Sequence, residues 1–225
     1  MISRIRIILC WIVLSVSISS VAQPRLSQPE YYLGVHGGAI ASMVNWSPSV
    51  PGTSGIKNTA FLSGNGGLVF RYNGHKCCGL QLELNYAQKG WRETTDSHSY
   101  KRTLDYIEIP FMTHIWFGKP TFRGYVNIGP QIGYCIRETH SGTEQVEEIH
   151  QYNAIDKRFT WGVCGGLGFY GRSQKAGCFQ LEARFNYNLG TLFKSTPADH
   201  FSQSNMMALS INLAYLFEIK PKKQK

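Results

Sequence analysis

Long apolar runs are missing from this sequence of 225 residues beyond its first 22 positions. A transmembrane helix needs about 20 consecutive apolar residues, and no later segment provides them. Linkers and low-complexity blocks are missing too, which predicts a single domain over 23–225. If the mature chain enters a membrane, it must do so with β-strands.

The N-terminus has the pattern of an export signal. Arg4 and Arg6 precede an apolar run over 7–16, and Ser20-Val21-Ala22 matches the small-x-small pattern of a cleavage site. The apolar run breaks into serines before it reaches the length of a membrane anchor. We therefore expect a cleaved signal peptide over 1–22 and a mature chain that begins at Gln23.

Acidic residues are scarce. The chain has 14 Asp and Glu residues against 23 Lys and Arg residues, a formal net charge of +9. Part of this excess leaves with the signal peptide and part lies in the lysines after 219, so the rest is modest. It suits a solvated surface, or one that meets the anionic headgroups of outer-membrane lipid and lipopolysaccharide. We expect no nucleic-acid partner, because export separates the chain from nucleic acid.

Aromatic residues and glycine are plentiful, and eight segments alternate apolar with polar residues. With 12 Tyr, 12 Phe and 23 Gly, the composition favours β-structure. Leu82 and Leu84, for example, share one face of a segment, and Glu83 and Asn85 share the other, because side chains alternate along a strand. The alternation predicts eight strands: 31–44, 61–72, 79–92, 104–117, 121–137, 157–170, 178–190 and 206–219.

The connections between these segments alternate in length. Four are expected as longer loops: 45–59, 93–101, 138–154 and 191–205. Three are expected as tight turns: 73–76, 118–120 and 172–177. Short periplasmic turns and longer extracellular loops are typical of outer-membrane barrels, and only a closed barrel pairs every backbone group within lipid. The sequence therefore predicts an all-β fold, a single eight-stranded antiparallel up-and-down transmembrane β-barrel.

Aromatic residues lie near several of the predicted strand ends. Girdles of aromatic residues at both membrane interfaces are typical of such barrels. We expect these residues to form them: Tyr32, Tyr72, Tyr86, Trp91, Trp161, Tyr187 and Phe217.

The polar faces carry charges of both signs in mid-strand. If the apolar faces meet lipid, these charges share a narrow lumen and must pair, because an unpaired buried ion is very costly. The interior of eight strands is just wide enough for side chains to fill, which argues against an open diffusion pore. We expect a structural ion-pair network in the lumen, formed by Arg71, Glu83, Glu108, Arg123, Glu182 and Arg184.

Several segments resemble a known family. The residues LELNYAQKG over 82–90, followed by LDYIEIP over 104–110, resemble the paired signature of PorT-like outer-membrane β-barrel proteins. YVNIGPQIGY over 125–134 and FNYNLG over 185–190 resemble later strands of that family. The resemblance covers nearly all of the mature chain and implies an eight-stranded barrel in the outer membrane of a Gram-negative bacterium. It implies no chemistry, and a link to protein secretion would rest on analogy of fold alone.

Cysteine is more frequent than the resemblance implies. Five cysteines remain after the signal peptide, and an oxidising periplasm permits disulfides. Cys135 and Cys164 both face the lumen in the predicted strands. A disulfide between them is one alternative, and two separate small residues are the other.

One loop contains residues that can ligate metal ions. His140 and His150 lie there with Glu144, Glu147 and Glu148. Their spacing matches no standard site, so we expect a solvated loop without metal or cofactor.

Sequence signs of catalysis are weak. His98 beside Ser97 or Ser99 imitates the His and Ser that some lipid-modifying barrels carry near the outer rim, but no nucleophile motif frames them. The leading function is therefore a non-enzymatic outer-membrane barrel that presents loops for recognition, adhesion or envelope and secretion assembly, with envelope proteins as partners. A lipid-modifying barrel enzyme and a soluble, lipocalin-like periplasmic carrier are the alternatives.

Overall fold

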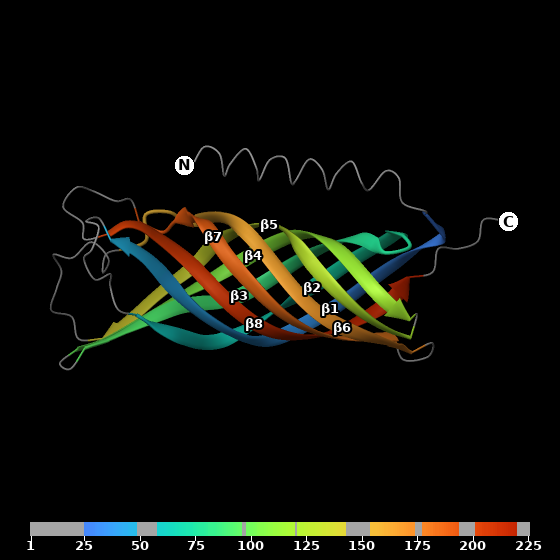
Figure 1. Cartoon of the computed structure of the whole chain (residues 1–225). Coiled ribbons are helices and arrows are strands. Elements are labelled where there is room, and N and C mark those ends of the chain that lie inside the picture. The colour runs from blue at the N-terminus through green and yellow to red at the C-terminus, as the bar shows by residue number, and fades with distance from the viewer. Residues whose placement is uncertain are drawn as a thin grey trace.

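Eight antiparallel strands follow one another around a closed barrel (Figure 1). The computed structural model describes residues 25–48, 58–95, 98–119, 121–142, 154–173, 177–193 and 201–219. β1 pairs with β8, which closes the ring. The predicted fold is thereby confirmed. The strands are β1 (Arg25–Pro48), β2 (Thr59–His75), β3 (Cys78–Thr95), β4 (His98–Lys119), β5 (Phe122–Gly142), β6 (Phe159–Ser173), β7 (Gly177–Thr191) and β8 (Phe201–Ile219).

The barrel wall is apolar outside and polar inside. On β7, Phe179 and Phe185 are 60% and 47% exposed, while Gln180 and Glu182 between them are buried. The same alternation runs through the other strands. It follows from the period of two of a strand, and it is the reverse of a soluble lipocalin-like carrier, whose apolar side chains would line the cavity. The carrier alternative is therefore wrong.

The two ends of the barrel differ. We call the end with the connections β2–β3, β4–β5 and β6–β7 the turn end, and the opposite end the loop end. Both described chain ends, Arg25 and Ile219, lie at the turn end (Figure 1). Gly118 and Gly177 have φ angles of 112° and 80° there. Glycine adopts these angles without steric cost, which explains its presence beside the tight connections.

The expected loop over 93–101 is wrong. β3 and β4 stay paired up to Thr95 opposite His98, with only 96–97 between the strands. Thr and Tyr residues in this stretch favour strands, and each arm supplies the backbone partners of the other. β5 follows β4 along the same extension, with Gly142 opposite Tyr100.

Two of the aromatic residues expected in the girdles lie inside the barrel instead. Tyr32 is 2% exposed and Trp91 is fully buried, whereas Tyr86, Trp161 and Phe217 face outward. The alternation explains the difference, because Trp91 shares its face of β3 with the lumen-facing Lys89. The expected signal peptide lies outside the described residues. No helix among the described residues has the length and apolarity to span a membrane.

Candidate functional site

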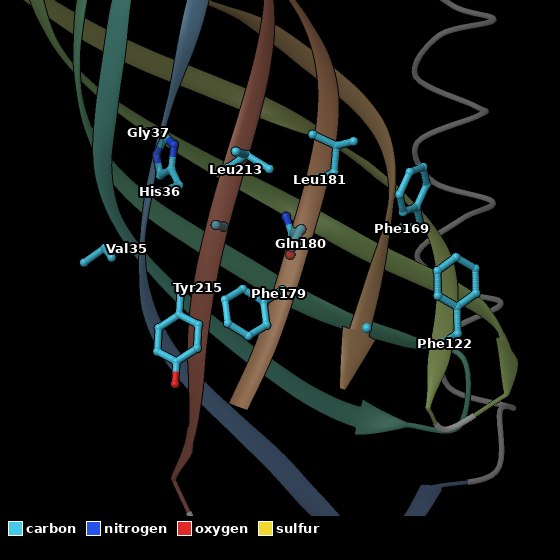
Figure 2. Close-up of a pocket in the computed structure, with 12 residues that line it drawn as sticks. Val35, His36, Gly37, Phe122, Phe169, Phe179, Gln180, Leu181, Leu213 and Tyr215 are labelled. Carbon is cyan, nitrogen blue, oxygen red and sulfur yellow. The ribbon is translucent and has the colours of Figure 1, made fainter. Parts of the chain in front are cut away.

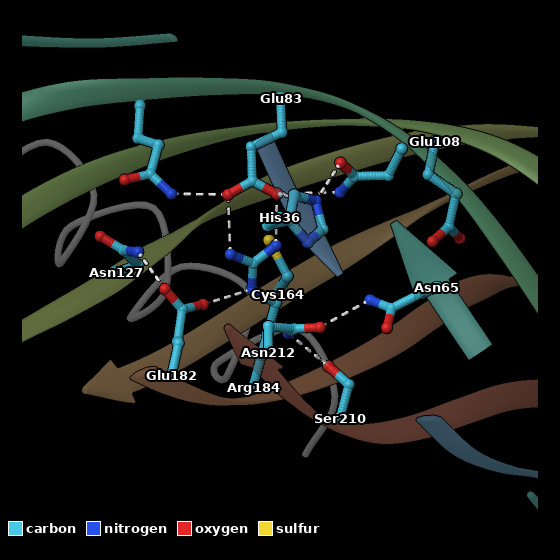
Figure 3. A network of polar contacts seen from close by, with 12 residues as sticks. His36, Asn65, Glu83, Glu108, Asn127, Cys164, Glu182, Arg184, Ser210 and Asn212 are labelled. Carbon is cyan, nitrogen blue, oxygen red and sulfur yellow. Dashed lines mark hydrogen bonds and ion pairs between the residues drawn. The ribbon is translucent and has the colours of Figure 1, made fainter. Parts of the chain in front are cut away.

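The centre of the lumen is occupied by one arginine between two glutamates (Figure 3). Arg184, at the midpoint of β7, donates from Nη1 and Nη2 to the two carboxylate oxygens of Glu83 on β3, at 2.6 and 2.7 Å. Its Nε donates to Glu182. All three side chains are buried. A forked pair of this kind is strong because guanidinium and carboxylate match in shape as well as charge.

Amide, imidazole and hydroxyl groups complete the contacts of both carboxylates. Asn85 Nδ2 donates to Glu83 at 2.8 Å, and the Nε2 atom of His36 lies 3.7 Å from the same carboxylate. Asn127 Nδ2 and the Tyr125 hydroxyl donate to Glu182 at 2.8 and 2.9 Å. Buried ions remain tolerable only when such additional hydrogen bonds replace their lost hydration. The cluster is therefore a fixed polar plug across the middle of the barrel.

A second buried ion pair lies nearer the loop end. Lys89 Nζ is 2.6 Å from Glu108 Oε1, which also accepts a hydrogen bond from Gln131 at 2.8 Å. Lys89 is fully buried and lies over the ring of Tyr106. The pair adds another layer of side chains across the lumen.

An apolar cluster closes the loop end of the barrel. Ile155, Leu192 and Phe193 lie outside the strands and pack against residues of the wall. The backbone N–H of Leu192 donates to Ser204 at 2.9 Å, which ties this segment to β8. The cluster consists of Val44, Trp46, Trp91, Leu104, Tyr106, Cys135, Ile155, Leu192, Phe193 and Met206.

One guanidinium is embedded in this apolar cluster. Arg102 is fully buried and pairs with Glu138 at 3.0 Å. Its guanidinium carbon lies 5.4 Å from the ring centre of Trp91 and 5.7 Å from that of Phe193. Cation–π contacts gain strength when they are desolvated. Arg102 therefore links the two aromatic rings to Glu138, which lies near the end of β5.

The turn end of the lumen holds a separate charged group. Arg172 lies 3.0 Å from Glu30 and 2.7 Å from Glu218, and joins β6 to β1 and β8. Arg123 is 3.7 Å from Glu30 and lies over Trp116. These pairs are partly exposed, so each contributes less than the central ones.

The six residues expected to form one network fall into several groups. Glu83, Glu182 and Arg184 meet at the centre, while Glu108 pairs with Lys89 and Arg123 with Glu30. Arg71 has no ion pair with another described residue, but it donates to Gln81 and Gln180, whose amides donate in turn to Glu83 and Glu182. It also lies over the rings of Tyr125 and Tyr170. All six side chains point into the barrel.

Sequence reasoning missed several members of these groups. The alternation places Lys89 on the polar face of its strand, but it does not show that Glu108 is its partner. Glu138 was hidden because its segment was assigned to a loop, and Arg102 because it lies between the expected loop over 93–101 and the predicted strand over 104–117. Glu30 and Arg172 lie just beyond the predicted strands, where the alternation gave no guidance.

The expected alternative of a disulfide between Cys135 and Cys164 does not occur, and both thiols are free. The register places Cys164 opposite Gly129, six residues before Cys135 on β5. At 3.3 Å per residue the separation is about 20 Å, whereas bridged Cα atoms lie within about 7 Å. Cys135 donates to the carbonyl of Arg137 and Cys164 to that of Gly129, at 3.2 and 3.5 Å.

The structure gives no support to the candidate metal ligands or to the candidate catalytic residues. Among the described residues, no group of three His, Cys, Asp or Glu side chains could hold a metal ion. His140 lies exposed near the end of β5, whereas His150, Glu144, Glu147 and Glu148 lie outside the described residues. The same holds for Ser97 and for the side chains of His98 and Ser99.

A groove of about 590 Å³ lies on the outer wall towards the turn end (Figure 2). It extends from the start of β5 across β6, β7 and β8 to β1, and its exposed lining is almost entirely apolar. Such a surface can contact acyl chains but offers no group for catalysis. Its larger side chains are Val35, Phe122, Phe169, Phe179, Leu181, Leu213 and Tyr215.

Residues 21–194 match the model of a known family, the outer membrane protein beta-barrel domain. The chain belongs to this family. An outer-membrane β-barrel accounts for the apolar outer wall and the paired charges within. No curated protein matches the chain.

Solved structures of outer-membrane barrels are similar to this one. The outer membrane protein OprG from Pseudomonas aeruginosa aligns with a TM-score of 0.55 and 13% identity, over 87% of this chain and 98% of that one. Outer Membrane Protein W of E. coli aligns at 14% identity and a TM-score of 0.41, over 87% and 100%. At such identity the likeness to OprG concerns the fold alone.

Proposed function

We propose that the protein is a non-enzymatic integral barrel without a diffusion pore, which acts through its loop end in recognition, adhesion or assembly of the cell envelope. The observation that supports this most is the occluded lumen. Arg184 with its two glutamates crosses the centre, and the apolar cluster around Arg102 covers the loop end.

The central plug opposes passage of a solute on energetic grounds. A hydrated ion in the lumen would have to separate Arg184 from Glu83 and Glu182. Leaving a buried charge without its partner costs about 3–5 kcal/mol. A solute would then still have to cross the apolar cluster without its own hydration. The barrel therefore serves as a membrane anchor that presents the loop end.

The same proposal includes orientation and surroundings. The turn end faces the periplasm and the loop end faces outward, in line with barrels of this class. The outer wall contacts outer-membrane lipid, and the basic surface meets lipopolysaccharide of a Gram-negative bacterium. Removal of residues 1–22 accompanies export.

Within the family, we propose a PorT-like barrel. The signature segments 82–90 and 104–110 lie on β3 and β4 and supply Glu83, Lys89 and Glu108 to the lumen. The signature residues therefore fill the lumen, and they indicate no catalytic activity. A role in envelope or secretion assembly would use the β3–β4 hairpin beside the end of β5, where partner proteins could bind.

Two measurements test the proposal. Folded protein in planar bilayers is expected to give no sustained conductance steps, and a steady open channel would refute the plug. For orientation, Thr139→Cys at the loop end and Lys119→Cys at the turn end are compared in a chain whose Cys77 and Cys78 are serine. Both positions are exposed. A membrane-impermeant maleimide on intact cells is expected to label only the first, and labelling of only the second would reverse the orientation.

A further inference from the structure

Two adjacent cysteines lie at the turn end: Cys77 ends the connection between β2 and β3, and Cys78 begins β3. Cys77 and Cys78 are both partly exposed, whereas Cys135, Cys164 and Cys178 are buried. Cys77 lies at a bend of the chain, and Cys78 is the residue directly after it. Vicinal residues within a regular strand point to opposite faces, and the bend at Cys77 interrupts that alternation.

We propose that Cys77 and Cys78 are a redox site, at which the two thiols form a reversible disulfide closed through their shared peptide bond. Three observations carry it: the two cysteines are adjacent at a bend, they are the accessible ones among the five described, and the family places the barrel in the cell envelope, where disulfides form. The inference holds whether or not the loop end has the proposed role.

The oxidant is a protein or small-molecule disulfide. One of the two thiolates attacks a sulfur of that disulfide, forms a mixed disulfide and releases one thiol of the oxidant. The neighbouring thiolate then attacks the mixed disulfide, forms the Cys77–Cys78 bond and releases the second thiol. Two electrons pass to the oxidant, and the two protons lost by the cysteines end on its two thiols.

Geometry makes this disulfide labile. Consecutive Cα atoms are about 3.8 Å apart, whereas bridged cysteines usually have Cα atoms about 4.4–6.8 Å apart. The bond is therefore strained, and strained or exposed disulfides are reduced more readily than structural ones. We therefore expect the site to cycle between the dithiol and the disulfide, and not to form a permanent structural disulfide.

A backbone hydrogen bond connects the site to a residue of the lumen. The backbone N–H of Trp116 on β4 donates to the carbonyl of Cys77 at 2.9 Å. That carbonyl belongs to the peptide inside the new ring, so ring closure must turn it. Trp116 lies against Arg123 and His114 in the turn-end lumen. Oxidation is therefore expected to speed hydrogen exchange at the Trp116 amide.

The test uses the full mature protein, extracted from the outer membrane in detergent. It is incubated with glutathione disulfide, and the remaining free thiols are blocked with N-ethylmaleimide. The protein is then digested, and the masses of its peptides are measured by mass spectrometry. The peptide with Cys77 and Cys78 is expected to be two hydrogens lighter and unlabelled, and to take two maleimides after mild reduction. Two maleimides without reduction, glutathione on both thiols, or a dimer linked through this peptide would each overturn the proposal.

Two variants separate the pair from single reactive thiols. In Cys77→Ser the remaining Cys78 is expected to lose its protection and to take maleimide or glutathione. The matched control, Cys178→Ser, removes a buried thiol at the same end and is expected to behave as the unchanged protein. If Cys78 stays protected in Cys77→Ser, its partner is another group and the pair is refuted.

Discussion

Replacing Arg184 with Met removes the cation that two buried carboxylates share. Both carboxylates would keep their other donors, but Glu83 would lose the forked contacts at 2.6 and 2.7 Å and Glu182 would lose its contact with Nε. Met preserves much of the side-chain volume, so the loss is mainly electrostatic. Removing one partner of a buried ion pair costs about 3–5 kcal/mol, and here two negative charges are left facing each other.

The assay is urea unfolding of the folded barrel in lipid vesicles, followed by tryptophan fluorescence and by the gel shift between folded and heated protein. The control is Arg137→Met. The side chain of Arg137 is 74% exposed and lies 3.4 Å from the buried Asp105, which keeps the Gln88 amide as a donor at 3.0 Å in the variant. Solvent screens the exposed guanidinium, so we expect this pair to contribute about 1 kcal/mol. The free energy of unfolding should fall by several times more for Arg184→Met.

A compensated variant isolates the electrostatic cause. Arg184→Met combined with Glu83→Gln and Glu182→Gln leaves no buried charge at the centre, so most of the lost stability should return. The reasoning is refuted if Arg184→Met costs no more than Arg137→Met. It is also refuted if the compensated variant is as unstable as the single one.

Three further outcomes are expected from the same unfolding assay. Lys89→Met leaves Glu108 with its amide donor alone and should lower the free energy of unfolding by about 3 kcal/mol; an unchanged value would mean that the pair contributes nothing. Trp91→Ala empties the apolar cluster and should cost about 3–5 kcal/mol, whereas the outward-facing Trp161→Ala should cost clearly less. Ile211→Arg on the outer wall should cost about 2–4 kcal/mol in a bilayer, and a neutral effect would place that wall away from lipid.

The strands and their orientation could be predicted because a barrel wall in lipid has one simple rule. Each strand alternates between an apolar and a polar side, and the alternation survives wherever both environments are present. Above the membrane both faces meet water, and the pattern fades. The paired stretch between Glu93 and Lys101 therefore looked like a loop, although its backbone pairs as regularly as the rest.

The central members of the candidate site were predictable, but their contacts were not. Alternation places Glu83, Glu182 and Arg184 in the lumen, but which charges meet depends on the tilt and register of strands far apart in the sequence. Glu83 and Arg184 are an example, since 101 positions separate them. Local pattern also failed at Cys135, because its distance from Cys164 follows from the β5–β6 register.

The apolar wall of the barrel meets lipid and encloses the charged side chains. Ile128 and Asn127 are neighbours on β5, 58% exposed and fully buried respectively. Nitroxide labels on Ile128→Cys and Asn127→Cys, in protein folded into vesicles, can be compared by their accessibility to oxygen dissolved in the bilayer. We expect strong relaxation by oxygen at 128 and weak relaxation at 127. Strong relaxation at 127 together with protection at 128 would mean that the polar face, and not the apolar one, contacts lipid.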